Sequence, residues 1–138
     1  MIKKVFIDTD VVLDVALARE PFFSASKMIL AMAENNIVIG NTSSNCIANI
    51  YYILRKIGGD DNARKFITNI IQYISIITIN HQNVLEALKS KFTDFEDALQ
   101  HYSAIENQCE YIITRNIEDY KSSKLKVILP EDFIKLFQ

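Results

Sequence analysis

The sequence contains few of the residues that interrupt, crosslink or loosen a folded chain. Its 138 residues include only 3 glycines, 2 prolines and 2 cysteines, which argues against long flexible linkers. No apolar run approaches the roughly 20 residues that a membrane span needs, and no internal repeat or low-complexity tract occurs. We therefore expect a single domain over residues 1–138 with no membrane contact.

An excess of positive charge is also missing. The net charge is −2 and the isoelectric point is about 5.7, unlike the overall charge of a typical nucleic-acid-binding protein. Any binding of nucleic acid would depend on a local basic surface. The basic clusters are Arg55-Lys56, Arg64-Lys65, and Arg115 with Lys121, Lys124 and Lys126. Such clusters are most often a solvated face of the protein.

The N-terminus argues against a secreted protein. Residues 1–4 resemble the basic start of a secretion signal, but the apolar stretch that would have to follow is interrupted. The interrupting residues are Asp8, Asp10 and Asp14. We therefore expect a cytoplasmic protein.

Hydrophobic residues make up 49% of the chain, enough to bury a core without disulfides or a structural metal. Charged residues make up 23% and are well mixed, which argues against disorder. Cys46 and Cys109 fall at core-facing positions of expected helices. Buried free thiols therefore fit these cysteines better than a disulfide or a metal pair.

Apolar strands and amphipathic helices alternate along the chain. Short β-branched or apolar runs predict strands at residues 4–7, 37–39 (ended by Gly40), 75–79, 111–113 and 127–129. Two helices are predicted over residues 10–17 and 44–57, and another follows Gly58-Gly59. Three more begin at the caps Ser24, Asn80 and either Thr93 or Asp94, and a last one begins at Pro130. This order predicts an α/β fold with a mostly parallel sheet between two helical layers, a three-layer α/β/α sandwich.

Five of these helices carry apolar residues that we expect to face inward, because their spacing of three and four residues marks one helix face. The helix after Ser24 carries Ala25, Ile29, Met32 and Ala33, and the helix over 44–57 carries Ile47, Ile50, Tyr51 and Leu54. The three later helices each carry a further stripe. The first of these is Ala63, Phe66, Ile67, Ile70, Ile71 and Ile74. The second is Val84, Leu85, Leu88 and Phe92. The third is Phe95, Ala98, Leu99, Tyr102, Ile105 and Cys109.

Acidic and amide residues gather where this topology brings strand ends together. Asp8 directly follows the first strand. The helix that begins near Asp94 and Asp97 leads into strand 111–113, runs antiparallel to it and therefore starts at the same edge. The residues placed at this edge are Asp8, Asn49, Asp94, Asp97, Asn116 and Asp119. Clustered carboxylates repel one another unless a cation neutralises them, and an all-oxygen set suits Mg²⁺ or Mn²⁺.

Each acid taken alone has a simpler interpretation. Asp94 suits an ordinary helix cap, and Asp119 suits a surface loop. Asp10 and Asp14 suit the positive end of a helix dipole. The prediction of a metal site therefore rests on the convergence of the acids and not on any one of them.

Four segments in order resemble the motif blocks of the PIN-domain family. They are residues 5–14 (VFIDTDVVLD), 49–56 (NIYYILRK), 94–100 (DFEDALQ) and 112–120 (IITRNIEDY). The resemblance covers nearly the whole chain and implies a PIN-like sandwich with Mg²⁺- or Mn²⁺-dependent endoribonuclease activity. Many members are VapC-type toxins, so it also implies an RNA substrate, an antitoxin partner and a homodimer.

The resemblance also implies roles for individual residues. Asp8 and Asp97 would be the principal metal ligands, with Asp94, Asn116 and Asp119 adding to the site. The implied catalytic set is Asp8, Asn49, Asp97 and Asp119. Thr114 would hydrogen-bond nearby, and Arg115 would meet substrate phosphate in a salt-sensitive contact. Thr9 and Asp10 would support the site.

One departure from the family pattern leaves a second hypothesis open. Asn49 stands where the family carries a glutamate, and an amide brings no charge and cannot act as a base. Asp10, where asparagine is usual, returns a negative charge nearby. The alternative function is a catalytically degenerate PIN-like domain that binds RNA or a protein without cleaving.

Two other enzyme classes fit poorly. Asp8-Thr9-Asp10 after a strand is also the nucleophile arrangement of haloacid-dehalogenase-type phosphatases, but the Gly-Thr continuation is missing and the chain is short. A receiver-type phosphoacceptor would need an aspartate at the end of strand 75–79. His81 and His101 belong to no Ser-His-Asp set. His101 lies one turn after Asp97, where it either orients that carboxylate or lines the helix surface.

Overall fold

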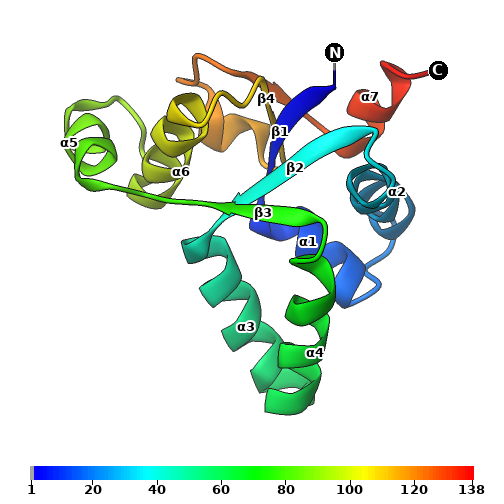
Figure 1. The fold of residues 1–138 in the computed structure, drawn as a ribbon. Helices are drawn as coiled ribbons and strands as arrows, with labels where there is room; N and C mark the ends of the chain where they lie inside the picture. Colours follow the sequence, from blue (N-terminus) through cyan, green and yellow to red (C-terminus); the bar gives the residue numbers. More distant parts are fainter. Residues whose placement is uncertain (1) are drawn as a thin grey trace.

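The computed structural model describes residues 2–138 and contains one five-stranded sheet in the order β3-β2-β1-β4-β5. The strands are β1 (Lys3–Ile7), β2 (Val38–Ser43), β3 (Ile74–Ile77), β4 (Tyr111–Ile113) and β5 (Lys126–Ile128). Every neighbouring pair is parallel, as the alternation of strands and helices predicted. The sheet lies at the centre of the molecule (Figure 1).

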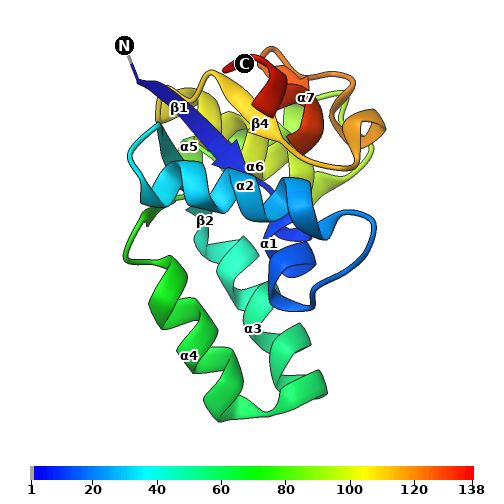
Figure 2. The ribbon, with the colours of Figure 1, turned by 90° about the vertical axis from the view of Figure 1, so that its right-hand side faces the viewer.

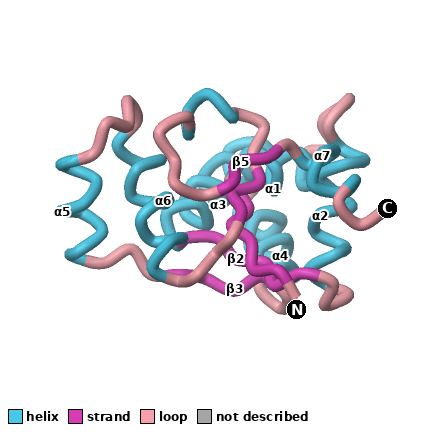
Figure 3. Tube along the Cα trace, turned by 90° about the horizontal axis from the view of Figure 1, so that it is seen from above, coloured by secondary structure: helices cyan, strands magenta, loops and turns pink. Residues whose placement is uncertain are grey.

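Seven α-helices and one short 3-10 helix flank this sheet in the described part of the chain. They are α1 (Thr9–Ala16), α2 (Phe23–Glu34), α3 (Ser44–Gly58), α4 (Asp60–Ile70), α5 (His81–Lys89), α6 (Phe95–Glu106), η1 (Ile117–Tyr120) and α7 (Pro130–Lys135). Helices α5 and α6 lie on one side of the strands, and α2 and α7 lie on the other (Figures 1 and 3). The three-layer α/β/α architecture is confirmed.

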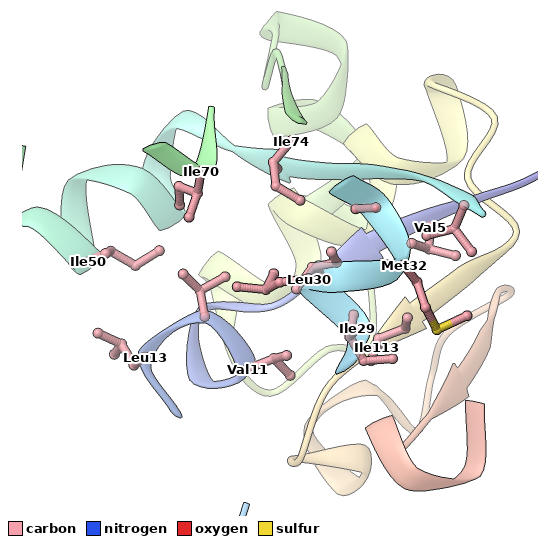
Figure 4. Close-up of a cluster of buried hydrophobic side chains, with 14 of the residues drawn as sticks. Val5, Val11, Leu13, Ile29, Leu30, Met32, Ile50, Ile70, Ile74 and Ile113 are labelled. Carbon is pink, nitrogen blue, oxygen red and sulfur yellow. The ribbon is translucent and has the colours of Figure 1, made fainter. Parts of the chain in front are cut away.

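The alternation of side chains along the central strands builds two cores. Val5 and Ile7 of β1 enter the larger cluster, beneath helices α1 to α4 and α7, whereas Phe6 enters a smaller cluster on the α6 side. All three side chains are fully buried. Figure 4 shows the larger cluster, where Ile29 and Leu30 of α2 meet residues from β1, α1 and β4. Strand β1 is therefore apolar on both faces over these three residues.

The order of the strands determines where a site can form. From β1 the chain proceeds outward through β2 to β3, and then returns to place β4 and β5 on the opposite side of β1. The direction of winding thus reverses between β1 and β4, and parallel sheets open a crevice at such a point, outside the carboxyl ends of the strands. Asp8 and Thr114 directly follow these two strands.

Several predicted boundaries were wrong, among them the end of the strand predicted over 75–79, because β3 ends at Ile77. Strand β2 does not end at Gly40 but continues to Ser43, and a Cβ at Gly40 would come within 2.8 Å of the Ile74 side chain. Helix α2 begins at Phe23, without a side-chain cap from Ser24. Helix α4 ends at Ile70, so Ile74 belongs to β3.

Two of the predicted inner faces were also wrong, because α5 packs mainly against α6. Val84, Leu85 and Leu88 are exposed, and α5 buries Asn83 and Ala87 instead. The buried residues of α6 are Ala98, Gln100, His101, Ser103 and Ala104. This face is more polar than the predicted stripe, from which Phe95 is exposed.

Both cysteines are free and buried, as predicted. Cys46 lies in α3, but Cys109 follows the end of α6 and is not helical. Among residues 2–138 no helix combines the length and the apolar character needed to cross a membrane. Helices α3 and α4 pack side by side and project from the sheet (Figure 2).

Candidate active site

A pocket of about 460 Å³ opens at the carboxyl edge of the sheet, where β1, α1, α3, α6 and the segment after β4 meet. Eight of the ten site residues predicted from the sequence line this pocket. These are Asp8, Thr9, Asp10, Asn49, Asp97, Arg115, Asn116 and Asp119. Asp94 and Thr114 lie next to the pocket without lining it.

Asp8 ends β1 and caps α1. Its Oδ1 accepts a hydrogen bond from the Thr9 amide at 2.8 Å, and its Oδ2 accepts one from the Thr114 hydroxyl at 2.9 Å. The residue is only 8% exposed. Burial, together with the nearby charge of Asp10, raises the pKa of Asp8 to about 6. Within residues 2–138 Asp8 forms no ion pair with a cationic side chain.

Asp10 ties the start of α1 to the segment after β4. Its Oδ2 accepts hydrogen bonds from the Arg115 amide at 3.0 Å and from Asn116 Nδ2 at 2.9 Å. Its Oδ1 is buried and has no hydrogen-bond partner within residues 2–138. Burial raises the pKa of Asp10, although Arg115 opposes the rise. Asp10 therefore holds two chain segments together at the pocket wall.

Asp94 and Asp97 occupy different environments although both start α6. Asp94 is the N-cap, and its Oδ1 accepts a hydrogen bond from the Asp97 amide at 2.9 Å. Asp97 is half-buried and faces the pocket. Burial, followed by the charges of Asp8 and Asp94, raises the pKa of Asp97 to about 7. The simpler interpretation of Asp94 as a helix cap agrees with this geometry.

The Arg115 guanidinium is committed to an ion pair. Its Nε and its second terminal nitrogen lie 2.7 and 3.0 Å from the two oxygens of Asp14, and the group stacks 3.9 Å over the ring of Phe22. Arg19 binds the same carboxylate at 3.0 Å. Asp14 is fully buried within α1, so its carboxylate does not sit at the helix end.

Of the predicted basic cluster at Arg115, Lys121, Lys124 and Lys126, only Arg115 lines the pocket within the described residues. His101 does not line the helix surface. It is fully buried, and its Nε2 accepts a hydrogen bond from the Lys124 amide at 3.0 Å. Burial lowers the pKa of His101 to about 4, so it anchors the loop before β5 as a neutral imidazole.

Three further residues at the site were not nominated from the sequence. Glu96 lines the pocket and accepts a hydrogen bond from Asn49 Nδ2 at 3.0 Å. Gln100 also lines it, and its Oε1 lies 2.9 Å from the Cys46 sulfur. The Tyr120 hydroxyl is buried without a hydrogen-bond partner in the described chain. Position 100 lies four residues after Glu96 and three after Asp97, so Gln100 neighbours both on α6, and this spacing was the available signal for α6. No local pattern indicated Tyr120.

The donor set fits a hard divalent cation held by few protein ligands. Within residues 2–138, no three His, Cys, Asp or Glu side chains are grouped as a ready-made metal cage. The pocket does offer the carboxylates of Asp8 and Asp97, and burial together with neighbouring acids raises the pKa of both. Mg²⁺ commonly binds through one or two carboxylates and keeps several waters. This arrangement suits such an ion.

The fold and the site define a parallel α/β/α protein with an acidic pocket at the switch point of its sheet. A family model described as the PIN domain matches residues 4–118. The chain belongs to the PIN domain family, which confirms the resemblance seen in the sequence.

Individual relatives agree with this assignment. Ribonuclease VapC1 of Aquifex aeolicus (strain VF5) is 28% identical over 136 residues, covering 95% of this chain and 93% of the relative. The structure of DNA-bound VapBC from Salmonella typhimurium matches with a TM-score of 0.71 at 12% identity, covering 94% and 99% of the two chains. VapC20 of Mycobacterium tuberculosis, described as a sarcin-ricin loop cleaving toxin, matches with a TM-score of 0.66 at 11% identity, covering 88% and 98%.

Proposed function

We propose that this chain is a metal-dependent endoribonuclease that hydrolyses RNA phosphodiester bonds and serves as the toxin of a toxin-antitoxin pair. The observation that carries the proposal is the meeting of Asp8 and Asp97 in one pocket, where neither has a cationic partner among residues 2–138. Family membership and a relative named as a ribonuclease support it.

In this proposal Asp8 and Asp97 hold Mg²⁺ or Mn²⁺, and Asn116 and Asp119 add oxygen ligands from the segment after β4. A bound ion of this kind lowers the pKa of a water and stabilises the charge that develops on phosphate. Asp94 acts through Asp97, because it caps the helix turn that presents it.

The remaining residues orient these groups. The Thr114 hydroxyl donates a hydrogen bond to Asp8 Oδ2 and so fixes the orientation of the carboxylate. Thr9 donates its amide to the same carboxylate, and Asp10 fixes the segment that carries Asn116. Arg115 lines the pocket and adds a positive field for RNA phosphate while its guanidinium stays paired with Asp14.

The proposed partners follow from the relatives. Two of the similar structures are described as toxin-antitoxin complexes or VapBC assemblies, which supports an antitoxin as the protein partner. A homodimer and a cytoplasmic location complete the proposal. The second candidate function, a PIN domain that binds RNA or protein without cleaving, is favoured by one observation, the neutral amide of Asn49 at the pocket wall.

The test compares the wild type with Asp97→Asn. Mn²⁺ is titrated into each by calorimetry, and each is then incubated with structured RNA in the presence of metal. We expect the wild type to bind Mn²⁺ and cleave, and the variant to lose both. A wild type that leaves RNA intact at saturating metal would support the non-cleaving function, and one that binds no Mn²⁺ at millimolar concentration would end the metal proposal.

A further inference from the structure

Asn49 and Glu96 face each other across the pocket. Asn49 lies in α3 and Glu96 lies in the first turn of α6, one residue before Asp97. Asn49 Nδ2 donates to Glu96 Oε1 at 3.0 Å, joining positions 47 residues apart in the sequence. Both side chains line the pocket with Asp8 and Asp97.

Glu96 is exposed, and its charge has no cationic partner in the part of the chain that the structure describes. Within residues 2–138 no Lys, Arg or His forms an ion pair with it. The two arginines of the pocket wall, Arg19 and Arg115, both bind Asp14. In the same part of the chain Oε2 of Glu96 makes no hydrogen bond, so one oxygen is fixed by the amide and the other is free.

The chemistry of the pair explains why position 49 carries an amide. A carboxylate at that position would repel Glu96 across a 3.0 Å contact, whereas an amide donates to it. The negative charge of the pair therefore belongs to Glu96 on α6, and the amide that orients it belongs to Asn49 on α3.

An independent feature also indicates that this pocket is built to receive a ligand. The Tyr120 side chain is 1% exposed, and its hydroxyl has no hydrogen-bond partner within residues 2–138. Burial raises the pKa of Tyr120, and the nearby charges of Asp8 and Asp97 raise it further. Buried polar groups are normally satisfied, and water or ligand groups in the pocket would satisfy this one.

We propose that Glu96 is a carboxylate of the divalent-cation site and that Asn49 is the residue that positions it. The inference rests on the proposed function, because it needs a cation in the pocket. Helix α6 then supplies two acids, Glu96 and Asp97. The neutral residue at position 49 accordingly does not mark a degenerate site.

The test measures Mn²⁺ affinity of the full chain by calorimetry, with circular dichroism to verify folding. Glu96→Gln should weaken binding about tenfold, within the range seen when groups around a metal are lost. Glu118→Gln removes the same charge from an exposed residue of η1 that does not line the pocket. This control should change the affinity less than about twofold.

Two double variants separate positioning from general packing. Asn49→Glu combined with Glu96→Gln returns the acid to α3 at unchanged net charge and should recover most of the affinity. Asn49→Ala should weaken binding about threefold in the wild type but add no further loss to Glu96→Gln, because the two residues act through one contact.

The outcomes are distinct. Glu96→Gln binding Mn²⁺ as tightly as Glu118→Gln overturns the inference, and so does a relocated acid that recovers nothing. Losses from Asn49→Ala that add fully to those of Glu96→Gln overturn the positioning role. A wild type that binds no Mn²⁺ contradicts the proposed function itself, and that result is visible before any variant is compared.

Discussion

Helix α1 carries two buried aspartates of opposite character. Asp14 is fully buried and is held by the guanidinium groups of Arg19 and Arg115. Asp8, at the N-cap of the same helix, is 8% exposed and is contacted by neutral donors, including the Thr114 hydroxyl. Burial raises the pKa of Asp8 to about 6.

The difference separates structural acids from site acids. A buried carboxylate with cationic partners is part of the framework, and removing either side leaves a charge unpaired. A buried carboxylate without such partners lowers the stability of the metal-free fold, and perturbed groups of this kind concentrate at functional sites. Asp97 belongs to the second kind, since burial and neighbouring acids raise its pKa to about 7.

The largest expected effect comes from Asp14→Asn. The change leaves Arg19 and Arg115 beside a neutral group, and breaking a buried ion pair in this way costs about 3 kcal/mol. Because the Arg115 guanidinium joins α1 to the segment after β4, we expect a loss of unfolding free energy of that size. Urea denaturation followed by circular dichroism measures it.

The matched control is Asp132→Asn. Asp132 pairs with Lys135 at 3.7 Å on the surface of α7, and exposed pairs of this kind contribute less than about 1 kcal/mol. If both variants lose the same small amount, the ion pairs of Asp14 are not structural and the comparison between the two aspartates fails.

Asp8→Asn, at the N-terminal end of α1, should raise the unfolding free energy, whereas Asp14→Asn lowers it. Without metal at pH 8, Asp8→Asn removes a buried charge whose pKa stands well above the ordinary 3.8. The helix cap is largely kept, because asparagine is as favourable an N-cap as aspartate. We expect the unfolding free energy to rise by about 1 kcal/mol in a urea titration with chelator present.

With Mn²⁺ added, the wild type should become more stable than Asp8→Asn, because only the wild type keeps the carboxylate that binds the ion. An Asp8→Asn variant that is less stable than the wild type even in chelator would show that Asp8 supports the metal-free fold and is not a strained site acid.

The contrast between the two aspartates also shows which features of the site could be predicted from the sequence. The strand that ends at Asp8 and the helix that starts at Asp94 are visible as local patterns, and the parallel topology then brings Asp8 and Asp97 to one edge. The partner of Asp14 is not visible locally, because Arg115 lies 101 residues away. Pairing across such a distance depends on the packing of complete elements.

The contacts of helices α5 and α6 likewise could not be predicted from local sequence patterns. The apolar stripe of α5 predicted burial of Val84 and Leu88, but the helix packs on α6 and leaves them exposed. Glu96 looks like an ordinary acid of a first helix turn, and only the fold places it against Asn49. Local periodicity identified the elements, whereas the contacts between distant side chains required the structure.

The smallest expected effect is a dependence of metal-free stability on pH. The folded-state pKa values of Asp8 and Asp97 are about 6 and about 7, above the ordinary 3.8. The stability that their protonated forms contribute is therefore lost as the pH rises through these values. His101 acts in the opposite direction, since its pKa of about 4 lies below 6.5 and its contribution is lost as the pH falls between these values.

From pH 6 to pH 8 the two carboxylates outweigh His101, so the unfolding free energy should fall. The net change stays below about 1 kcal/mol because solvent screens the half-buried Asp97. Thermal unfolding in chelator at the two pH values measures it, and Asp97→Asn should reduce the fall. Saturating Mg²⁺ should abolish it, since the ion replaces the protons as the compensating charge. A metal-free protein that gains stability from pH 6 to pH 8 would mean that the site acids are already neutralised by the fold, and the distinction from Asp14 would then disappear.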